Sequence, residues 1–292
     1  MNNSLTVVVA VQGGAEGLPA LLDMLGRQRT RGVDVALSWA SDDGAAEDAV
    51  SGAPAWARRV PGPDGALIPE LWTAGIESTE ADRVALTIVH CQPSPDWLEA
   101  LRAADLSSDA GVGGPIRQAP DADPVSWAVY LQRYVPFGPG VLPAGEVVEI
   151  AGDNALYARD RLEEVRDSWQ GGFWELDVHA AFRARGWTLR FDPALEVEHR
   201  NGYSPTEFIR QRFRHGLLFG RGRAESMPAA RRAAYRALSP TIPVLFGRKV
   251  LQRALAWAPA RPHLVRSAPW LLVFLAAWSA GEILGANGKN AS

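Results

Sequence analysis

Strand-like apolar runs alternate with amphipathic helical segments along the first hundred residues, and this alternation constrains the fold more than any other feature. Leu5–Val11, Val33–Trp39 and Arg83–Val89 have the apolar content and length of buried strands. Leu18–Gln28 places leucines at helical spacing between the first two strands, and Leu67–Ile76 precedes the third with a helical pattern. Alternating strands and helices imply βαβ units, so we expect an α/β fold with a mixed, mainly parallel sheet flanked by helices.

The rest of the chain is less regular. Residues 111–150 are rich in glycine and proline, which suits loops and strands that cross the carboxyl edge of the sheet. A helix is predicted from about residue 174 to residue 185, with a stop at Gly186 and a strand at Thr188–Phe191. Further helices are expected at 206–219 and 229–238. A length of 292 residues accommodates one large domain, predicted at 1–225, and a C-terminal helical region at 226–292.

The net charge of -3 conceals a strong asymmetry along the chain. Residues 1–199 carry 15 Lys and Arg against 30 Asp and Glu, whereas residues 200–266 carry 14 against 2. Such a basic block suits nucleic acid, anionic lipid or substrate phosphates. The zinc-finger spacings and aromatic signatures that would read a nucleic acid are absent from the sequence, so we expect no nucleic-acid partner.

An uncharged segment with two tryptophans, Ala268–Gly281, follows the basic block. A basic stretch that leads into such a segment is typical of attachment to an anionic membrane surface. The segment is shorter than the roughly 20 residues that a spanning helix needs. An interfacial or re-entrant helix is therefore the first expectation. A single span that extends to about residue 286, or a helix packed on the domain or on a partner subunit, are the alternatives.

Cys91 is the only cysteine, so the chain forms no internal disulfide, and nothing in the sequence suggests an oxidising compartment. The first apolar run is too short for the core of a secretory leader and has no basic residue before it. We therefore expect a cytoplasmic protein at the inner face of the cell membrane.

Two carboxylates mark the start of the helix near residue 174, in the segment WELDVH. Glu175 and Asp177 both fall in its first turn, where acidic side chains favour the helix macrodipole. A carboxylate at such a position is also a suitable general base for deprotonating a hydroxyl. The spacing alone leaves both interpretations open.

Five segments, taken in order, resemble family-2 glycosyltransferases of the GT-A fold, the Rossmann-like fold of nucleotide-sugar transferases. The likeness covers about residues 4–225, and the tail resembles the ending of bacterial members that work at the inner membrane surface. The segments are LTVVVAVQGGAEGLPALLDMLGRQ, RVALTIVHCQPSPDWLEAL, AGDNALYARDRL, GGFWELDVHAAFRARGWTLRFDPALEVEHR and QRFRHGLLFGRGRA.

This resemblance implies an inverting transfer of a sugar from a nucleotide-sugar donor to an acceptor hydroxyl of a lipid-linked glycan, polysaccharide or natural product. It implies that Glu175 is the general base, with Asp177 as the alternative. The family's Asp-X-Asp-like motif at the end of the fourth strand is replaced here by Thr87-Ile88-Val89-His90. The resemblance leaves His90 and His199 as tentative ligands for Mn²⁺ or a similar divalent cation.

The donor-binding candidates are spread along the chain. Where the family has an aspartate after the second strand, this chain has Trp39, so Asp42 or Asp43 is expected to substitute for it. Asp153 and Asn154 stand where the family holds donor or acceptor groups, although both residue types also make ordinary helix caps. If no metal binds, the resemblance suggests cations that would neutralise the diphosphate, although they also suit a solvated or lipid-facing surface. These are Arg210, Arg212, Arg214 and His215.

Two functions therefore remain open. Glu175, Asp177, Asn154 and His199 favour an active transferase. The loss of the usual carboxylates near Val89 and at Trp39 favours a catalytically degenerate domain that acts as a scaffold or regulatory partner of another transferase.

Overall fold

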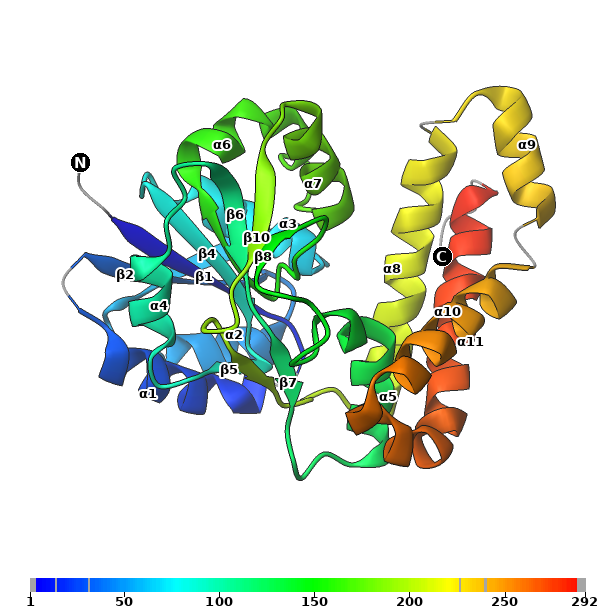
Figure 1. Cartoon of the computed structure of the whole chain (residues 1–292), viewed down its shortest axis with the longest axis horizontal. Helices are drawn as coiled ribbons and strands as arrows, with labels where there is room; N and C mark the ends of the chain where they lie inside the picture. The colour runs from blue at the N-terminus through cyan, green and yellow to red at the C-terminus, as the bar shows by residue number, and fades with distance from the viewer. Residues whose placement is uncertain (1–3, 14, 31, 226, 239–240, 288–292) are drawn as a thin grey trace. The chain divides into compact units, whose positions relative to one another are not determined.

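A computed structural model describes residues 4–13, 15–30, 32–225, 227–238 and 241–287 of the chain (Figure 1). These residues form two compact units. Unit 1 comprises residues 1–119 and 137–202, and unit 2 comprises residues 120–136 and 203–292, apart from the positions outside the described ranges. The division does not fall at residue 225, the boundary that we expected, because the helix before this residue packs within unit 2.

A mixed sheet forms the centre of unit 1, with strand order β3-β2-β1-β4-β9-β6-β10-β8. The first four strands of this order are parallel, β9 is antiparallel to both β4 and β6, and β8 is antiparallel to β10. The strands are β1 (Leu5–Val11), β2 (Val33–Ala40), β3 (Ala57–Gly62), β4 (Arg83–Ile88), β6 (Asp109–Gly113), β8 (Gly145–Val147), β9 (Asn154–Ala158) and β10 (Thr188–Phe191).

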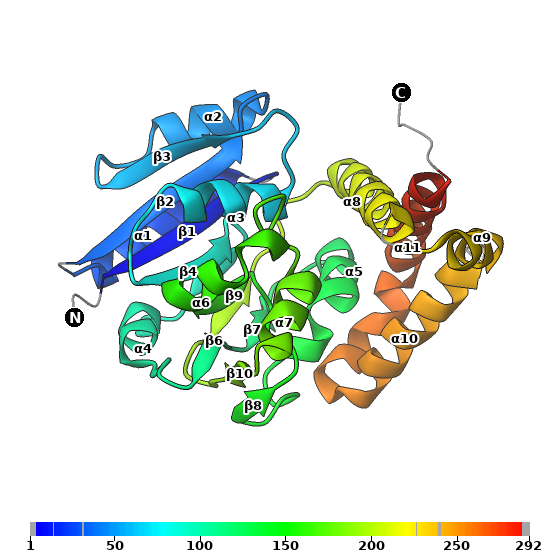
Figure 2. The same cartoon turned by 90° about the horizontal axis from the view of Figure 1, so that it is seen from above.

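Helices cover both faces of this sheet (Figures 1 and 2). The chain moves outward from β1 to β2 and β3, and then returns past them to β4. Because parallel crossovers are right-handed, the helices of the outward steps and the helix of the return step lie on opposite faces, as Figure 1 shows for α2 and α3. The helical segments of unit 1 are η1 (Ala15–Gly17), α1 (Leu18–Gln28), α2 (Gly44–Ser51), α3 (Ile68–Glu77), α4 (Trp97–Ala103), α6 (Arg159–Glu164), η3 (Arg166–Ser168) and α7 (Glu175–Ala184), and the short η2 (Val135–Phe137) falls at the division between the two units.

A small second sheet extends the carboxyl end of β4. Its central strand is β11 (Val197–His199), which is antiparallel to β5 (Cys91–Pro93) and parallel to β7 (Ile116–Gln118). This pairing places His199 opposite both Cys91 and Gln118, immediately beyond the end of the main sheet.

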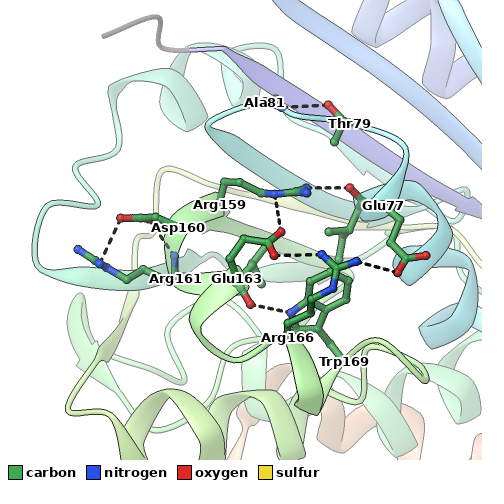
Figure 3. A network of polar contacts seen from close by, with 11 residues as sticks. Glu77, Thr79, Ala81, Arg159, Asp160, Arg161, Glu163, Arg166 and Trp169 are labelled. Carbon is green, nitrogen blue, oxygen red and sulfur yellow. Dashed lines mark hydrogen bonds and ion pairs between the residues drawn. The ribbon is translucent and has the colours of Figure 1, made fainter.

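An exposed network of ion pairs ties α6 and η3 to the end of α3 (Figure 3). The Arg166 guanidinium lies 3.0 Å from Glu163 and 3.3 Å from Glu77, and Arg159 pairs with Glu163 at 2.9 Å. Arg159 also donates to the Ile76 carbonyl at 2.8 Å, which satisfies an end of α3. Because solvent screens these charges, the network fixes the position of α6 more than it adds stability.

Unit 2 is helical, and its longest helices, α8 and α11, lie side by side (Figure 1). Four glycines let the two backbones approach closely. A Cβ atom added at Gly216 or Gly220 would lie 2.1 or 2.2 Å from a carbonyl oxygen of α11, and one at Gly281 or Gly285 would lie 2.0 Å from a carbonyl oxygen of α8. The helical segments are α5 (Pro124–Arg133), α8 (Pro205–Glu225), α9 (Ala229–Leu238), α10 (Ile242–Ala256), η5 (Ala258–His263) and α11 (Leu264–Ala286).

The structure confirms the predicted α/β class and the mainly parallel sheet, with the early strands and helices close to their expected bounds. The prediction that residues 111–150 form loops and strands is wrong in one respect, because this segment contains helix α5. Asp123 caps this helix by accepting from the Ser126 amide at 2.7 Å, and a proline follows at the first helical position.

The close contacts of the glycines in α8 and α11 predict that one added methyl group destabilises unit 2. Gly281→Ala would place a Cβ atom 2.0 Å from the Phe213 carbonyl oxygen, so the helices must separate. We expect a loss of about 1–3 kcal/mol of stability, measured as a lower melting temperature of the full chain. Gly222→Ala in α8 is the matched control because no atom lies within 4 Å of its added Cβ. Alanine favours the helical conformation at residue 222, so this control should not lose stability. An equal loss of stability in both variants would contradict the proposed backbone contact.

Candidate functional site

The carboxyl ends of β1 and β4 mark the point where the strand order changes direction, which is where open α/β sheets bind their ligands. Gln12 follows β1 and His90 follows β4, and the two meet there. The His90 Nε2 atom lies 3.2 Å from the Gln12 carbonyl oxygen, and the Gln12 side chain donates to the Ala66 carbonyl at 2.9 Å. The topology therefore gathers the loops after β1, β3 and β4 at one edge.

The hydrogen bonds of the two His90 ring nitrogens determine its tautomer. The Gly202 amide donates to Nδ1 at 3.2 Å, so this nitrogen uses its lone pair as an acceptor. The Gln12 carbonyl can only accept, so Nε2 carries the proton. In this neutral form neither ring nitrogen offers a lone pair to a cation. His90 is therefore a structural link between β1, β4 and the segment at residue 202.

The predicted metal site is not supported. His199 Nδ1 lies 3.0 Å from the Gln118 side-chain oxygen, and its ring meets the His90 ring at a centroid distance of 6.3 Å. Within the described ranges, no group of three or more His, Cys, Asp or Glu side chains is arranged to hold a metal ion. The hydrogen bonds of His90 use both of its ring nitrogens, so this geometry does not favour His90 as a ligand, and a metal site at His90 and His199 stays a prediction.

The two aspartates after β2 organise the loops at this edge. Asp43 caps α2 by accepting from the Ala46 amide at 3.1 Å. Asp42 accepts from the Gly65 amide at 2.6 Å. Gly65 has a φ of 64°, a left-handed backbone conformation that glycine adopts more readily than other residues. Asp42 is exposed, whereas Trp39 is buried at the end of β2. Donor binding by Asp42 or Asp43 stays a prediction, with Asp42 the more accessible carboxylate.

Asn154 has a structural role that the sequence did not predict. Its side chain is 1% exposed and begins strand β9 rather than capping a helix. Its oxygen accepts from the Trp97 indole at 2.9 Å, and its nitrogen donates to the Pro115 and Leu195 carbonyls at 3.2 and 2.5 Å. The amide is therefore committed to protein partners. Donor binding would have to come from its neighbour Asp153, a buried residue whose carbonyl accepts from the Thr87 hydroxyl at 3.0 Å.

Glu175 lies at the start of α7, and its carboxylate is fixed beside the end of β4. Its Oε1 atom accepts from the Gly152 amide at 3.1 Å. Gly152 packs on Trp72, whose indole donates to the Thr87 carbonyl at 2.9 Å. A methyl group at residue 152 would lie 2.9 Å from the Trp72 ring and 3.0 Å from the Glu175 carboxylate, so glycine is required there. Asp177, the alternative base, is exposed in the same first turn of the helix.

A buried hydrogen-bond chain, Glu149–His179–Tyr157, lies behind this carboxylate and was missed by sequence reasoning. The His179 Nδ1 atom lies 2.6 Å from Glu149, and its Nε2 atom lies 2.9 Å from the Tyr157 hydroxyl. Burial first, and then the charges of Glu175, Glu149 and Asp153, raise the pKa of Tyr157 well above its usual value. The phenol therefore stays protonated, and the His179 ring links it to the Glu149 carboxylate.

The sequence contained one signal for this chain. His179 is four residues after Glu175 and lies between the buried residues Val178 and Phe182, so it occupies an apolar helix face where a histidine needs partners.

The four predicted cations of α8 belong to unit 2. Arg210 and Arg214 are exposed, whereas Arg212 is buried and lies over the rings of Phe208 and Trp278 at 4.9 and 5.4 Å. Burial first, and then the charges of Arg212 and Arg133, lower the pKa of His215 well below its usual value. His215 is therefore neutral at pH 7, and its prediction as a cation is wrong.

Tyr157→Phe tests the buried chain. Removal of the hydroxyl leaves the buried His179 Nε2 atom without this hydrogen-bond partner, so we expect a loss of about 1–3 kcal/mol of stability. The melting temperature is measured for Tyr157→Phe, for His179→Leu and for the double variant. In the His179→Leu background the tyrosine substitution should cost much less, because its partner is already absent. Equal costs in both backgrounds would show that the two side chains are not coupled.

No protein-family model and no curated protein sequence matches the chain. Its structure is similar to that of a mannosyltransferase from Pyrobaculum calidifontis in complex with GDP-Man and Mn²⁺, with a TM-score of 0.53 and 18% identity over 96% of this chain and 86% of that one. Weaker similarity extends to residues 1–349 of TarS from S. aureus, with a TM-score of 0.49 and 10% identity over 98% and 92% of the two chains. A mycobacterial protein gives 0.48 and 15% over 74% of each chain. The similarity to the mannosyltransferase confirms the expected resemblance at the level of the fold.

Proposed function

We propose that the protein transfers a sugar, with inversion, from a nucleotide-sugar donor to a hydroxyl of a lipid-linked glycan, polysaccharide or natural product. The observation that carries this proposal is the position of Glu175, which a backbone amide holds beside the end of β4. The shared fold of a mannosyltransferase solved with GDP-Man supports a nucleotide-sugar donor at the same edge.

In this mechanism Glu175 removes the proton of the acceptor hydroxyl as the oxygen attacks the anomeric carbon. The bond from that carbon to the diphosphate breaks, and its electron pair leaves with the nucleoside diphosphate. A single displacement inverts the anomeric centre. The hydrogen bond from Gly152 keeps the Glu175 carboxylate in one orientation and so limits the reorganisation that the step requires.

Binding of a donor is tested by thermal melting of the full chain with GDP, UDP and dTDP, each with and without Mn²⁺. A nucleotide at 100 times its Kd should stabilise the chain by about 2.7 kcal/mol. We expect a shift without Mn²⁺ because the described residues offer no metal cluster. A shift that appears only with Mn²⁺ would contradict the metal-free site.

Glu175→Gln tests the base. The amide oxygen of glutamine still accepts from Gly152, so the shift caused by the donor should persist, while release of the nucleoside diphosphate falls by about 10²–10⁴-fold. Asp177→Asn is the matched control, since Asp177 is exposed in the same helical turn. It should keep nearly full turnover. The reverse pattern would assign the base to Asp177.

A catalytically degenerate domain that regulates another transferase is the second candidate function. The commitment of His90 and Asn154 to structural hydrogen bonds favours it, because groups expected to meet the donor are engaged elsewhere. No melting shift with any nucleotide, in either the presence or the absence of Mn²⁺, would support this second function and refute the first.

A further inference from the structure

Apart from Arg266 in its first turn, the surface of α11 that does not pack inside unit 2 is apolar over four turns. Spacings of three and four residues place its members on one face of the helix. This face, the α11 stripe, consists of Val265, Pro269, Leu272, Val273, Ala276 and Ala280. Val265 and Leu272 are 85% and 67% exposed, which is unusual for large aliphatic side chains.

Exposed cations lie on the two helical segments that precede this stripe and in the first turn of α11 itself. Residues 226–281 contain eight basic and no acidic residues. Of these, the basic side chains of α10, η5 and the start of α11 are exposed, and α10 adds exposed aliphatic residues such as Val244 and Leu255. The exposed cations are Arg248, Lys249, Arg253, Arg261 and Arg266. An apolar helix face beside cations, with no acidic residue, complements an anionic lipid surface. A second copy of the same surface would instead bring these cations together.

By length and composition alone, the helix at Ala258–Ala286 could cross a membrane. Its packing argues otherwise. α8 runs alongside the second half of α11, from the contact of Phe208 with Phe274 to that of Leu217 with Gly285. A spanning α11 would carry α8 into the hydrocarbon, together with the exposed Arg210 and Arg214, and charges there are strongly disfavoured.

The buried face of α11 also carries a carboxylate. Glu282 is buried and accepts hydrogen bonds from the Trp278 indole at 3.1 Å and from the Tyr235 hydroxyl, and Arg223 lies 3.8 Å from it. These contacts hold α11 to α8 and α9 within a folded helical unit. The helix has one face for its protein neighbours and one face, the α11 stripe, for another surface.

We propose that unit 2 is a monotopic membrane-binding module whose α11 stripe inserts into the interface of an anionic bilayer without crossing it. The exposed cations contact the lipid head groups, and α8 stays on the aqueous side. This inference does not depend on sugar transfer by unit 1.

Flotation of the full chain with vesicles tests the proposal. Binding is expected to vesicles of phosphatidylcholine and phosphatidylglycerol, to be much weaker with phosphatidylcholine alone, and to be reversed by high salt. Leu272→Glu should weaken binding by about tenfold or more. It removes an aliphatic group that would insert into the bilayer, and it adds a charge that anionic lipid repels. Val148→Glu in unit 1 is the matched control, because Val148 is 65% exposed outside the stripe, and it should bind like the unmodified chain.

The melting temperature of each variant shows whether a loss of vesicle binding comes from unfolding. Because Leu272 is exposed, Leu272→Glu should melt like the unmodified chain, and Val265→Glu provides a second variant on the same stripe. Three results would overturn the proposal. They are absence of flotation with anionic vesicles, binding that resists both high salt and alkaline carbonate as a spanning helix does, and a dimer in solution that Leu272→Glu dissociates.

Discussion

The pairing of β9 with β4 is the constraint on which the candidate site depends. Antiparallel register places Asn154 opposite Thr87, so the loop before β9 arrives at the carboxyl end of β4. The Asn154 amide then joins α4 and the carbonyls of Pro115 and Leu195 in the buried interior. Loss of that amide would leave several buried polar groups unpaired at once, each of which is costly in a low-dielectric environment. The Gly152 amide reaches Glu175 only because this register is fixed.

Much of unit 1 could be predicted because its early elements have simple periodicities. Leu5–Val11 and Leu18–Gln28 coincide with the expected strand and helix. Strand β3 was not predicted, since Arg58, Arg59 and Pro61 give it the composition of a loop. It is the edge strand beside β2, where solvent tolerates charged side chains and a proline. Local sequence does not reveal which strand lies at the edge, because that depends on the order of the whole sheet.

The sequence pointed to some residues of the candidate site and not to others. Glu175 was selected through the family resemblance, because its spacing on the helix leaves its role open, and its role as general base stays a prediction. The chain Glu149–His179–Tyr157 could not, since its members come from a loop, a helix and a strand and only tertiary packing brings them together. His90 shows the opposite failure. Its residue type suggested a metal ligand, but two backbone groups that no sequence pattern specifies determine its chemistry.

The role of His90 also explains why a carboxylate cannot simply be restored at that position. An aspartate could accept from the Gly202 amide as His90 does, but an ionised carboxylate has no proton to donate to the Gln12 carbonyl, to which His90 donates. Two acceptors in contact without a proton repel each other, and burial strengthens that repulsion. A carboxylate at residue 90 therefore requires the loop after β1 to move, or a cation to lie between the two oxygens. His90 and its two hydrogen bonds therefore form one coupled arrangement, in which a hydrogen bond joins the loops after β1 and β4.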